Sequence, residues 1–122
     1  MTPVWGPLLL VIGLFTLGAL PQFFVPRLTL FRVTFGVETN DPFTLLLARH
    51  WALLASLVGA LLVYAAYHPP VRAAAMCVAG VEKLGLAGLV LFGGWKRTPT
   101  ATRLAAADAV MGLVLLFGLA TL

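Results

Sequence analysis

Hydrophobic residues form four long stretches along this chain, residues 5–25, 43–67, 71–94 and 104–122. Each stretch has about the 20 residues that an α-helix needs to cross the hydrocarbon core of a bilayer. Lipid offers no hydrogen-bond partner to backbone N–H and C=O groups, so such stretches cross a membrane as helices. The pattern therefore predicts an all-α fold, an integral membrane bundle of four helices.

Proline marks where three of these helices begin. At each start, a side chain that can cap a helix stands before a Pro at the first helical position, where the missing N–H costs nothing. The three pairs are Thr2-Pro3, Asp41-Pro42 and Thr98-Pro99. A tight antiparallel turn is expected at Pro69-Pro70. The predicted helices are residues 3–25, 42–67, 71–94 and 99–121, in a single domain that covers residues 1–122.

The connection between the first two helices has another pattern. Within residues 27–37, a face that is expected to be apolar alternates with a second face at a period of two, which is typical of extended backbone. The first face is Thr29, Phe31, Val33, Phe35 and Val37, and the second is Leu30, Arg32, Thr34 and Gly36. We therefore predict a short extended segment at the membrane interface. The segment either covers the bundle or gates a cavity within it.

Composition and charge support a membrane protein and indicate its orientation. Apolar residues make up 61% of the chain and charged residues 10%, with a net charge of +4. Basic residues in short loops stay in the cytoplasm, so this charge reports topology and not a nucleic-acid partner. One side of the predicted bundle carries only Arg72, and the other carries Arg27, Arg32, Arg49, Lys96, Arg97 and Arg103. We expect a multi-pass protein of a cell inner membrane with both termini outside the cytoplasm.

Five ionisable residues inside the predicted spans are the candidate functional residues. They are Arg49, His50, Glu82, Lys83 and Asp108. A central charge in a membrane helix costs roughly 2.5 to 3.5 kcal/mol, so such residues normally find partners or line a wet cavity. This cost leaves two interpretations open. The residues form a charge network that fixes helix order, or they line a polar cavity that binds a ligand head group or moves a proton.

The adjacency of Glu82 and Lys83 predicts their partners. Neighbouring residues on a helix point about 100° apart, so the two side chains cannot pair with each other. In a four-helix bundle they face two different neighbouring helices. We expect Lys83 to pair with Asp108, and Glu82 to contact Arg49 or His50.

The sequence offers no metal site, and it leaves any cofactor and any catalytic residue unknown. His50 and His68 are the only histidines, and 18 residues along one helix separate them by about 27 Å. The spacing of His, Cys and acidic residues matches no zinc or iron site. Small residues recur at a spacing of four in the second helix, at Ala52, Ser56 and Ala60, which suits close packing within the chain and homo-oligomer formation alike.

Several local features together resemble the DoxX-like superfamily of small four-helix membrane proteins. They are the run from Ala48 to Leu54, which reads Ala-Arg-His-Trp-Ala-Leu-Leu, together with Gly59, the turn Pro69-Pro70-Val71-Arg72 and the Ala-rich third helix. Some relatives in that superfamily are subunits of quinol-oxidising membrane complexes. The resemblance implies quinone or another isoprenoid lipid as a ligand, and it transfers no catalytic residue.

We therefore expect a protein that binds a lipophilic ligand, quinone-like or isoprenoid-like, or that serves as an accessory subunit of a larger membrane complex. One alternative is a membrane enzyme that acts on an amphipathic lipid-like substrate, with Glu82 or Asp108 as acid or base beside His50. The other is a proton-coupled carrier. The sequence leaves these three open.

Overall fold

The computed structural model describes residues 4–122, and the predicted helix start at Thr2-Pro3 lies outside them. Four long helices are present: α1 (Trp5–Leu17), α4 (Pro42–Tyr67), α5 (Arg72–Phe92) and α6 (Pro99–Thr121). Four helical segments are long and apolar enough to cross a membrane: Trp5–Phe24, Pro42–Tyr67, Pro69–Phe92 and Pro99–Thr121. No strand occurs in the part of the chain that the structure describes. The predicted all-α bundle of a multi-pass membrane protein is confirmed.

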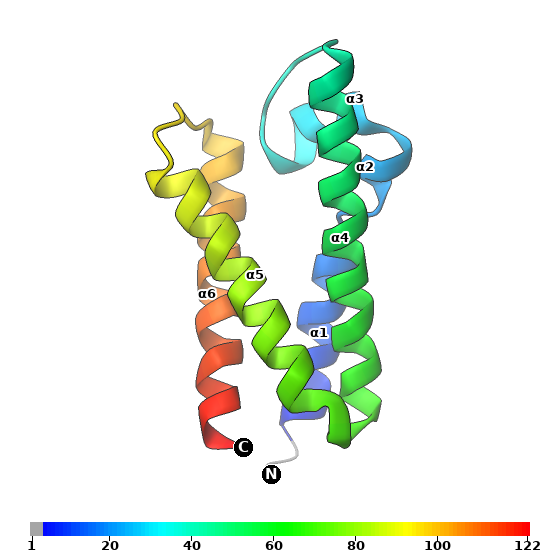
Figure 1. Ribbon diagram of the computed structural model, residues 1–122, viewed down its shortest axis with the longest axis vertical. Helices are drawn as coiled ribbons and strands as arrows, with labels where there is room; N and C mark the ends of the chain where they lie inside the picture. Colours follow the sequence, from blue (N-terminus) through cyan, green and yellow to red (C-terminus); the bar gives the residue numbers. More distant parts are fainter. Residues whose placement is uncertain (1–3) are drawn as a thin grey trace.

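The helices are arranged as two pairs, α1 with α4 and α5 with α6 (Figure 1). The start of α1, the end of α6 and the Pro69–Val71 turn lie at one end of the bundle, which we call the hairpin end. The connections 35–41 and 93–98 lie at the other, the loop end. Helix α5 meets α4 at the hairpin end and slopes away from it toward the loop end. The two pairs are therefore closest at the hairpin end.

Two of the predicted helix caps are formed. Asp41 accepts a hydrogen bond from the Thr44 backbone N–H at 2.9 Å, and α4 begins at Pro42. Thr98 Oγ1 accepts one from the Ala101 N–H at 3.1 Å, and α6 begins at Pro99. In both cases the cap occupies an N–H group that the first helical turn leaves unpaired.

The first predicted helix is interrupted. Helix α1 ends at Leu17, and a separate turn of helix, α2 (Pro21–Phe24), follows. Pro21 has no N–H to donate to the carbonyl one turn earlier, so a regular helix cannot continue through it. Between them, backbone hydrogen bonds span three residues instead of the four of an α-helix, such as Leu20 N–H to the Leu17 carbonyl at 3.0 Å. The interruption leaves a bend in the wall of the bundle.

The predicted extended segment at residues 27–37 is wrong. Most of it is helical, as α3 (Pro26–Thr29) and a π-helical turn, η1 (Leu30–Thr34). Its buried residues are Thr29, Leu30 and Thr34, which have helical spacing, whereas Phe31 and Val33 of the predicted apolar face are exposed. Contact with the bundle, and not the alternation, decides the conformation of this segment. Only residues 35–41 of the connection are free of helix.

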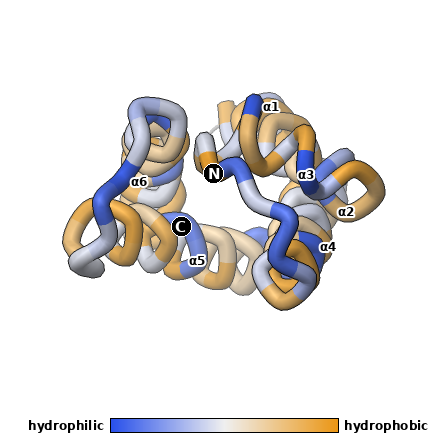
Figure 2. Tube along the Cα trace, turned by 90° about the horizontal axis from the view of Figure 1, so that it is seen from above, coloured by the Kyte–Doolittle hydropathy of each residue, from blue (hydrophilic) through white to orange (hydrophobic). Residues whose placement is uncertain are grey.

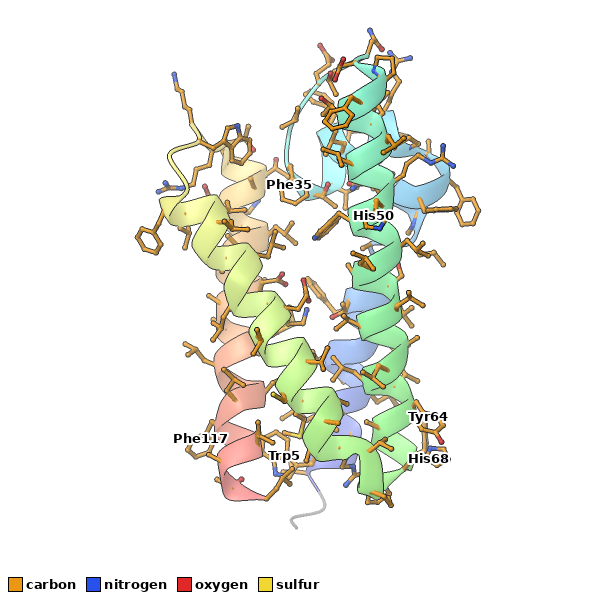
Figure 3. The ribbon with its side chains drawn as sticks, in the orientation of Figure 1. Trp5, Phe35, His50, Tyr64, His68 and Phe117 are labelled. Carbon is orange, nitrogen blue, oxygen red and sulfur yellow. The ribbon has the colours of Figure 1, made fainter. Side chains whose placement is uncertain are left out.

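The hairpin end is packed with apolar side chains from all four long helices. The buried cluster contains Trp5 and Leu9 of α1, Leu62 of α4, Met76 of α5 and Leu115 of α6, and Trp5 lies between the helices near this end (Figure 3). On the outside, most of the helical trace is hydrophobic, as lipid contact requires (Figure 2).

Glycines set the distance within each helix pair. A Cβ atom at Gly59 of α4 would lie 2.8 Å from the Gly13 carbonyl of α1, so these backbones touch. Gly80 and Gly112 play the same part between α5 and α6, where a Cβ at Gly112 would lie 3.2 Å from the Gly80 carbonyl. Close backbone approach at small residues is the usual basis of helix association in lipid.

Candidate functional site

Lys83 and Asp108 form a buried ion pair between α5 and α6. The side chain of Lys83 is 2% exposed and that of Asp108 6%, and Lys83 Nζ lies 3.4 Å from Asp108 Oδ1. This confirms the predicted pairing. Within residues 4–122 it is the only ion pair, and the only hydrogen bond of Lys83 Nζ. An ammonium group can donate three hydrogen bonds, so this one long contact leaves donor capacity free.

Glu82 does not contact Arg49 or His50, and that predicted pairing is wrong. Arg49 is exposed, and its Nε donates a hydrogen bond of 2.9 Å to the Phe23 carbonyl. His50 is also exposed, on the half of α4 that is nearer the loop end (Figure 3). The prediction assumed that α5 runs alongside α4, whereas α5 slopes away from α4 toward the loop end.

Glu82 Oε1 is instead buried without a hydrogen-bond partner in the described part of the chain. A buried carboxyl oxygen normally has at least one partner, because leaving it unpaired costs the free energy of its lost hydration. A bound molecule or water is one way in which such an oxygen gains a partner.

Glu82, Lys83 and Asp108 line one cavity of about 330 Å³. Its other walls come from the end of α1 and the bend after it, from η1, and from α4 and α6: Leu14, Phe15, Thr16, Gly18, Ala19, Val33, Thr34, Trp51, Ala55 and Leu104. The cavity therefore joins three polar groups on one side to a mainly apolar surface on the other. Arg49 and His50 are not among its walls.

A buried hydrogen-bond network that the sequence analysis missed supports this wall. Gln22 of α2 is fully buried and donates from Nε2 to the Ala48 carbonyl of α4 at 2.8 Å. Its Oε1 accepts a hydrogen bond from the Thr34 hydroxyl of η1. Gln22 thus joins three elements, and Thr34 also lines the cavity. The available signal was a lone amide directly after Pro21 in an apolar run.

A second contact ties η1 to α6. The Thr98 hydroxyl caps α6 and also donates to the Phe35 carbonyl at the end of η1. Next to it, Gly36 has a φ of +70°, a conformation that favours glycine, and a Cβ there would collide with Thr98. These contacts fasten the segment after α2 across the loop end, above the cavity.

The cavity offers both hydrogen-bond donors and an acceptor. Lys83 supplies the donors and the unpaired Glu82 oxygen supplies the acceptor, within mainly apolar walls. Residues 4–122 contain no group of three or more His, Cys, Asp or Glu residues that could hold a metal ion. No protein-family model, curated protein or solved structure matches this chain.

Proposed function

We propose that this membrane protein binds a lipophilic molecule in the cavity between α1, α4, α5 and α6, with the polar head group of that molecule at Glu82 and Lys83. The observation that carries the proposal is the buried Glu82 oxygen without a partner, on the wall of a cavity of about 330 Å³. Binding pockets typically combine mainly apolar walls with a few polar groups that orient the ligand, and this cavity has that composition.

The position of the cavity suits a ligand that arrives from the bilayer. Leu14, Phe15 and Val33 contribute to its walls and are also more than half exposed, so the cavity opens to the surface of the bundle. The outer face is the surface that contacts lipid in a membrane helix bundle. A head group can occupy the cavity while a longer apolar tail remains between these side chains and the surrounding lipid. At about 330 Å³, the cavity is near the lower limit for ligand pockets, which suits a head group alone.

The polar groups favour a head group that both accepts and donates hydrogen bonds. Lys83 can donate to a carbonyl or hydroxyl oxygen, and Glu82 can accept from a hydroxyl. A quinone and its quinol, or an isoprenoid alcohol, have this chemistry. Quinone is also the ligand implied by the resemblance to the DoxX-like superfamily, so we propose that class first. The enzyme alternative with His50 beside the carboxylates has no such support, because His50 lies outside the cavity.

We further propose that the protein lies in a cell inner membrane with the loop end in the cytoplasm and both termini outside. The loop-end connections and the helix turns beside them carry Arg27, Arg32, Arg49, Lys96, Arg97 and Arg103, and basic loops are retained in the cytoplasm. The cavity lies toward the loop end of the bundle and is then reached from the cytoplasmic half of the bilayer. A reporter that is active only outside the cytoplasm should be active when it is fused after Leu122. Activity of a reporter that works only in the cytoplasm would contradict this orientation.

Fluorescence of Trp51 tests ligand binding, because Trp51 lines the cavity and quinones quench tryptophan emission. Decylubiquinone is titrated into protein in detergent, and farnesol, which does not quench, is added as a competitor. We expect saturable quenching that farnesol reverses, and that Trp51→Phe removes. In Glu82→Gln, affinity should fall about tenfold, since a hydrogen bond to a charged group contributes about 1.5 kcal/mol or more.

Glu38→Gln is the matched control, because Glu38 is an exposed carboxylate of the first connection. It should bind as the wild type does. Quenching that never saturates, or equal affinity in Glu82→Gln and the wild type, would rule out the cavity as the binding site for this class of ligand.

A further inference from the structure

Arg49 is a charged residue inside a candidate membrane span, where its charge needs a partner. It lies within the candidate span Pro42–Tyr67, seven residues or about 10 Å from its start, and its side chain is exposed on the outside of the bundle. No carboxylate of residues 4–122 lies within 4.0 Å of it, because the only ion pair in this part of the chain joins Lys83 and Asp108. A lipid-facing arginine in a span needs an anion or access to the interface.

The guanidinium group of Arg49 is held in place with its outer edge free. Nε donates to the Phe23 carbonyl at 2.9 Å, and the group lies 5.1 Å from the centre of the Phe23 ring. These two contacts orient the planar group against α2. Its two terminal nitrogens make no hydrogen bond within residues 4–122. A guanidinium edge of this kind binds a phosphate through two parallel hydrogen bonds.

A groove beside Arg49 fits the rest of a lipid molecule. The groove has a volume of about 750 Å³, and His50 lies in it next to Arg49. Apolar side chains of α4 and of the segment after the bend form its other walls, among them Phe23, Pro26, Leu46 and Leu53. The groove thus combines one fixed cation with an apolar channel on the lipid-facing surface.

The depth of Arg49 agrees with that of a lipid head group. Its partner Phe23 lies in the last turn of the candidate span Trp5–Phe24. Arg49 is therefore level with the end of that span, where the hydrocarbon core borders the head groups. The same end of the bundle carries the basic connections, which attract anionic lipid.

We propose that Arg49 binds the phosphate of an anionic phospholipid, whose acyl chain lies in the groove along Leu46 and Leu53. This site is separate from the cavity at Glu82 and Lys83, since the two share no lining residue. The bound lipid supplies the counter-charge that residues 4–122 do not supply to Arg49. It also fastens α2 to α4 through the Phe23 contact.

Native mass spectrometry of the purified protein tests this site, with phosphatidylglycerol and phosphatidylcholine added in equal amounts. Wild-type protein should retain phosphatidylglycerol about tenfold more than phosphatidylcholine, which corresponds to about 1.4 kcal/mol. Arg49→Gln should lose this preference. Arg103→Gln is the matched control, because it removes one exposed charge near the same end of the bundle and should keep the preference.

A second variant covers the case in which Arg49→Gln does not fold. Leu46 is 60% exposed, so Leu46→Trp fills the groove without disturbing the core. It should also reduce phosphatidylglycerol retention. An equal loss in Arg103→Gln would indicate diffuse attraction to the basic end and overturn the proposal. So would an undiminished preference in Arg49→Gln, or a wild type that retains both lipids equally.

Discussion

The two ends of the bundle are built on different physical principles. At the hairpin end, side chains of all four long helices meet in an apolar cluster. Further along α1 and α4, Gly13 and Gly59 bring two backbones into contact. Toward the loop end, α5 slopes away from α4, and the buried groups include Gln22, Lys83 and Asp108. The hairpin end is mainly apolar, and its buried Arg72 donates to the Ala65 and Ala66 carbonyls. The other end contains polar groups that line a cavity.

The difference indicates where function lies. Between lipid and the bundle interior there is little hydrophobic driving force, so the hairpin end depends on close contact between small residues. Buried ionisable groups oppose stability unless they are paired, because their desolvation is costly. Around the cavity, Lys83 and Asp108 are buried together with one oxygen of Glu82, so this desolvation cost falls toward the loop end. We take the loop-end half as the functional half.

The largest expected effect comes from breaking the ion pair. Lys83→Met leaves Asp108 without its partner and should lower the free energy of unfolding by about 3 kcal/mol or more. Titration with sodium dodecyl sulfate in mixed micelles measures this change. Lys83→Met combined with Asp108→Leu should recover most of the loss, because the apolar pair carries no buried charge. A Lys83→Met protein as stable as the wild type would show that the pair contributes nothing.

A smaller effect is expected from the glycine contact between α1 and α4. Gly59→Ala places a Cβ 2.7 Å from the Leu17 backbone nitrogen, so α1 and α4 must move apart at a cost of about 1 to 3 kcal/mol. Gly85→Ala is the matched control, because a Cβ there meets nothing within 4 Å. Its better helix propensity should raise stability by up to about 1 kcal/mol. Equal effects in the two variants would contradict close backbone packing between α1 and α4.

The sequence was sufficient for the parts of the fold that depend on local chemistry. The apolar stretches and the caps at Asp41 and Thr98 follow from length and from hydrogen bonds within one turn. The pairing of Lys83 with Asp108 was also predictable, because a lysine in the middle of a span cannot reach water. The interruption at Pro21 was open to the same reasoning, since proline in a helical run removes a hydrogen bond.

The remaining features depend on how the helices pack against one another. The predicted contact of Glu82 with Arg49 or His50 was wrong because α5 diverges from α4. No local sequence pattern encodes that slope. The helical form of residues 27–34 was missed because burial of Thr29 and Thr34 against the bundle overrides the alternation in sequence. The cavity lies where these features meet, because its walls include η1, the residues after α1 and the sloping α5.

The smallest expected effect is a pH dependence at the loop end. The side-chain hydroxyl and the backbone N–H of Thr44 both donate to Asp41, which lowers the pKa of this carboxyl below its ordinary value. A lowered pKa in the folded state adds stability above the unfolded pKa of about 3.9, and this is lost as the pH falls through the folded value. Asp41→Asn keeps a capping side chain but removes the charge.

The Asp41→Asn protein should therefore melt slightly below the wild type at pH 7. The difference should shrink as the pH falls below about 4 and disappear below the folded pKa. Thermal melting followed by circular dichroism at a series of pH values measures this. A difference that stays constant across the series would assign the effect of Asp41 to something other than its charge.

The most direct test of two separate sites in the loop-end half is native mass spectrometry of wild type, Glu82→Gln and Arg49→Gln after gentle extraction from the host membrane. We expect the wild type to carry a lipophilic molecule that is not a phospholipid, together with an anionic phospholipid. Glu82→Gln should lose the first and keep the second, and Arg49→Gln should do the reverse. A wild type without the first molecule, or a Glu82→Gln protein that retains it fully, would contradict a binding role for the cavity.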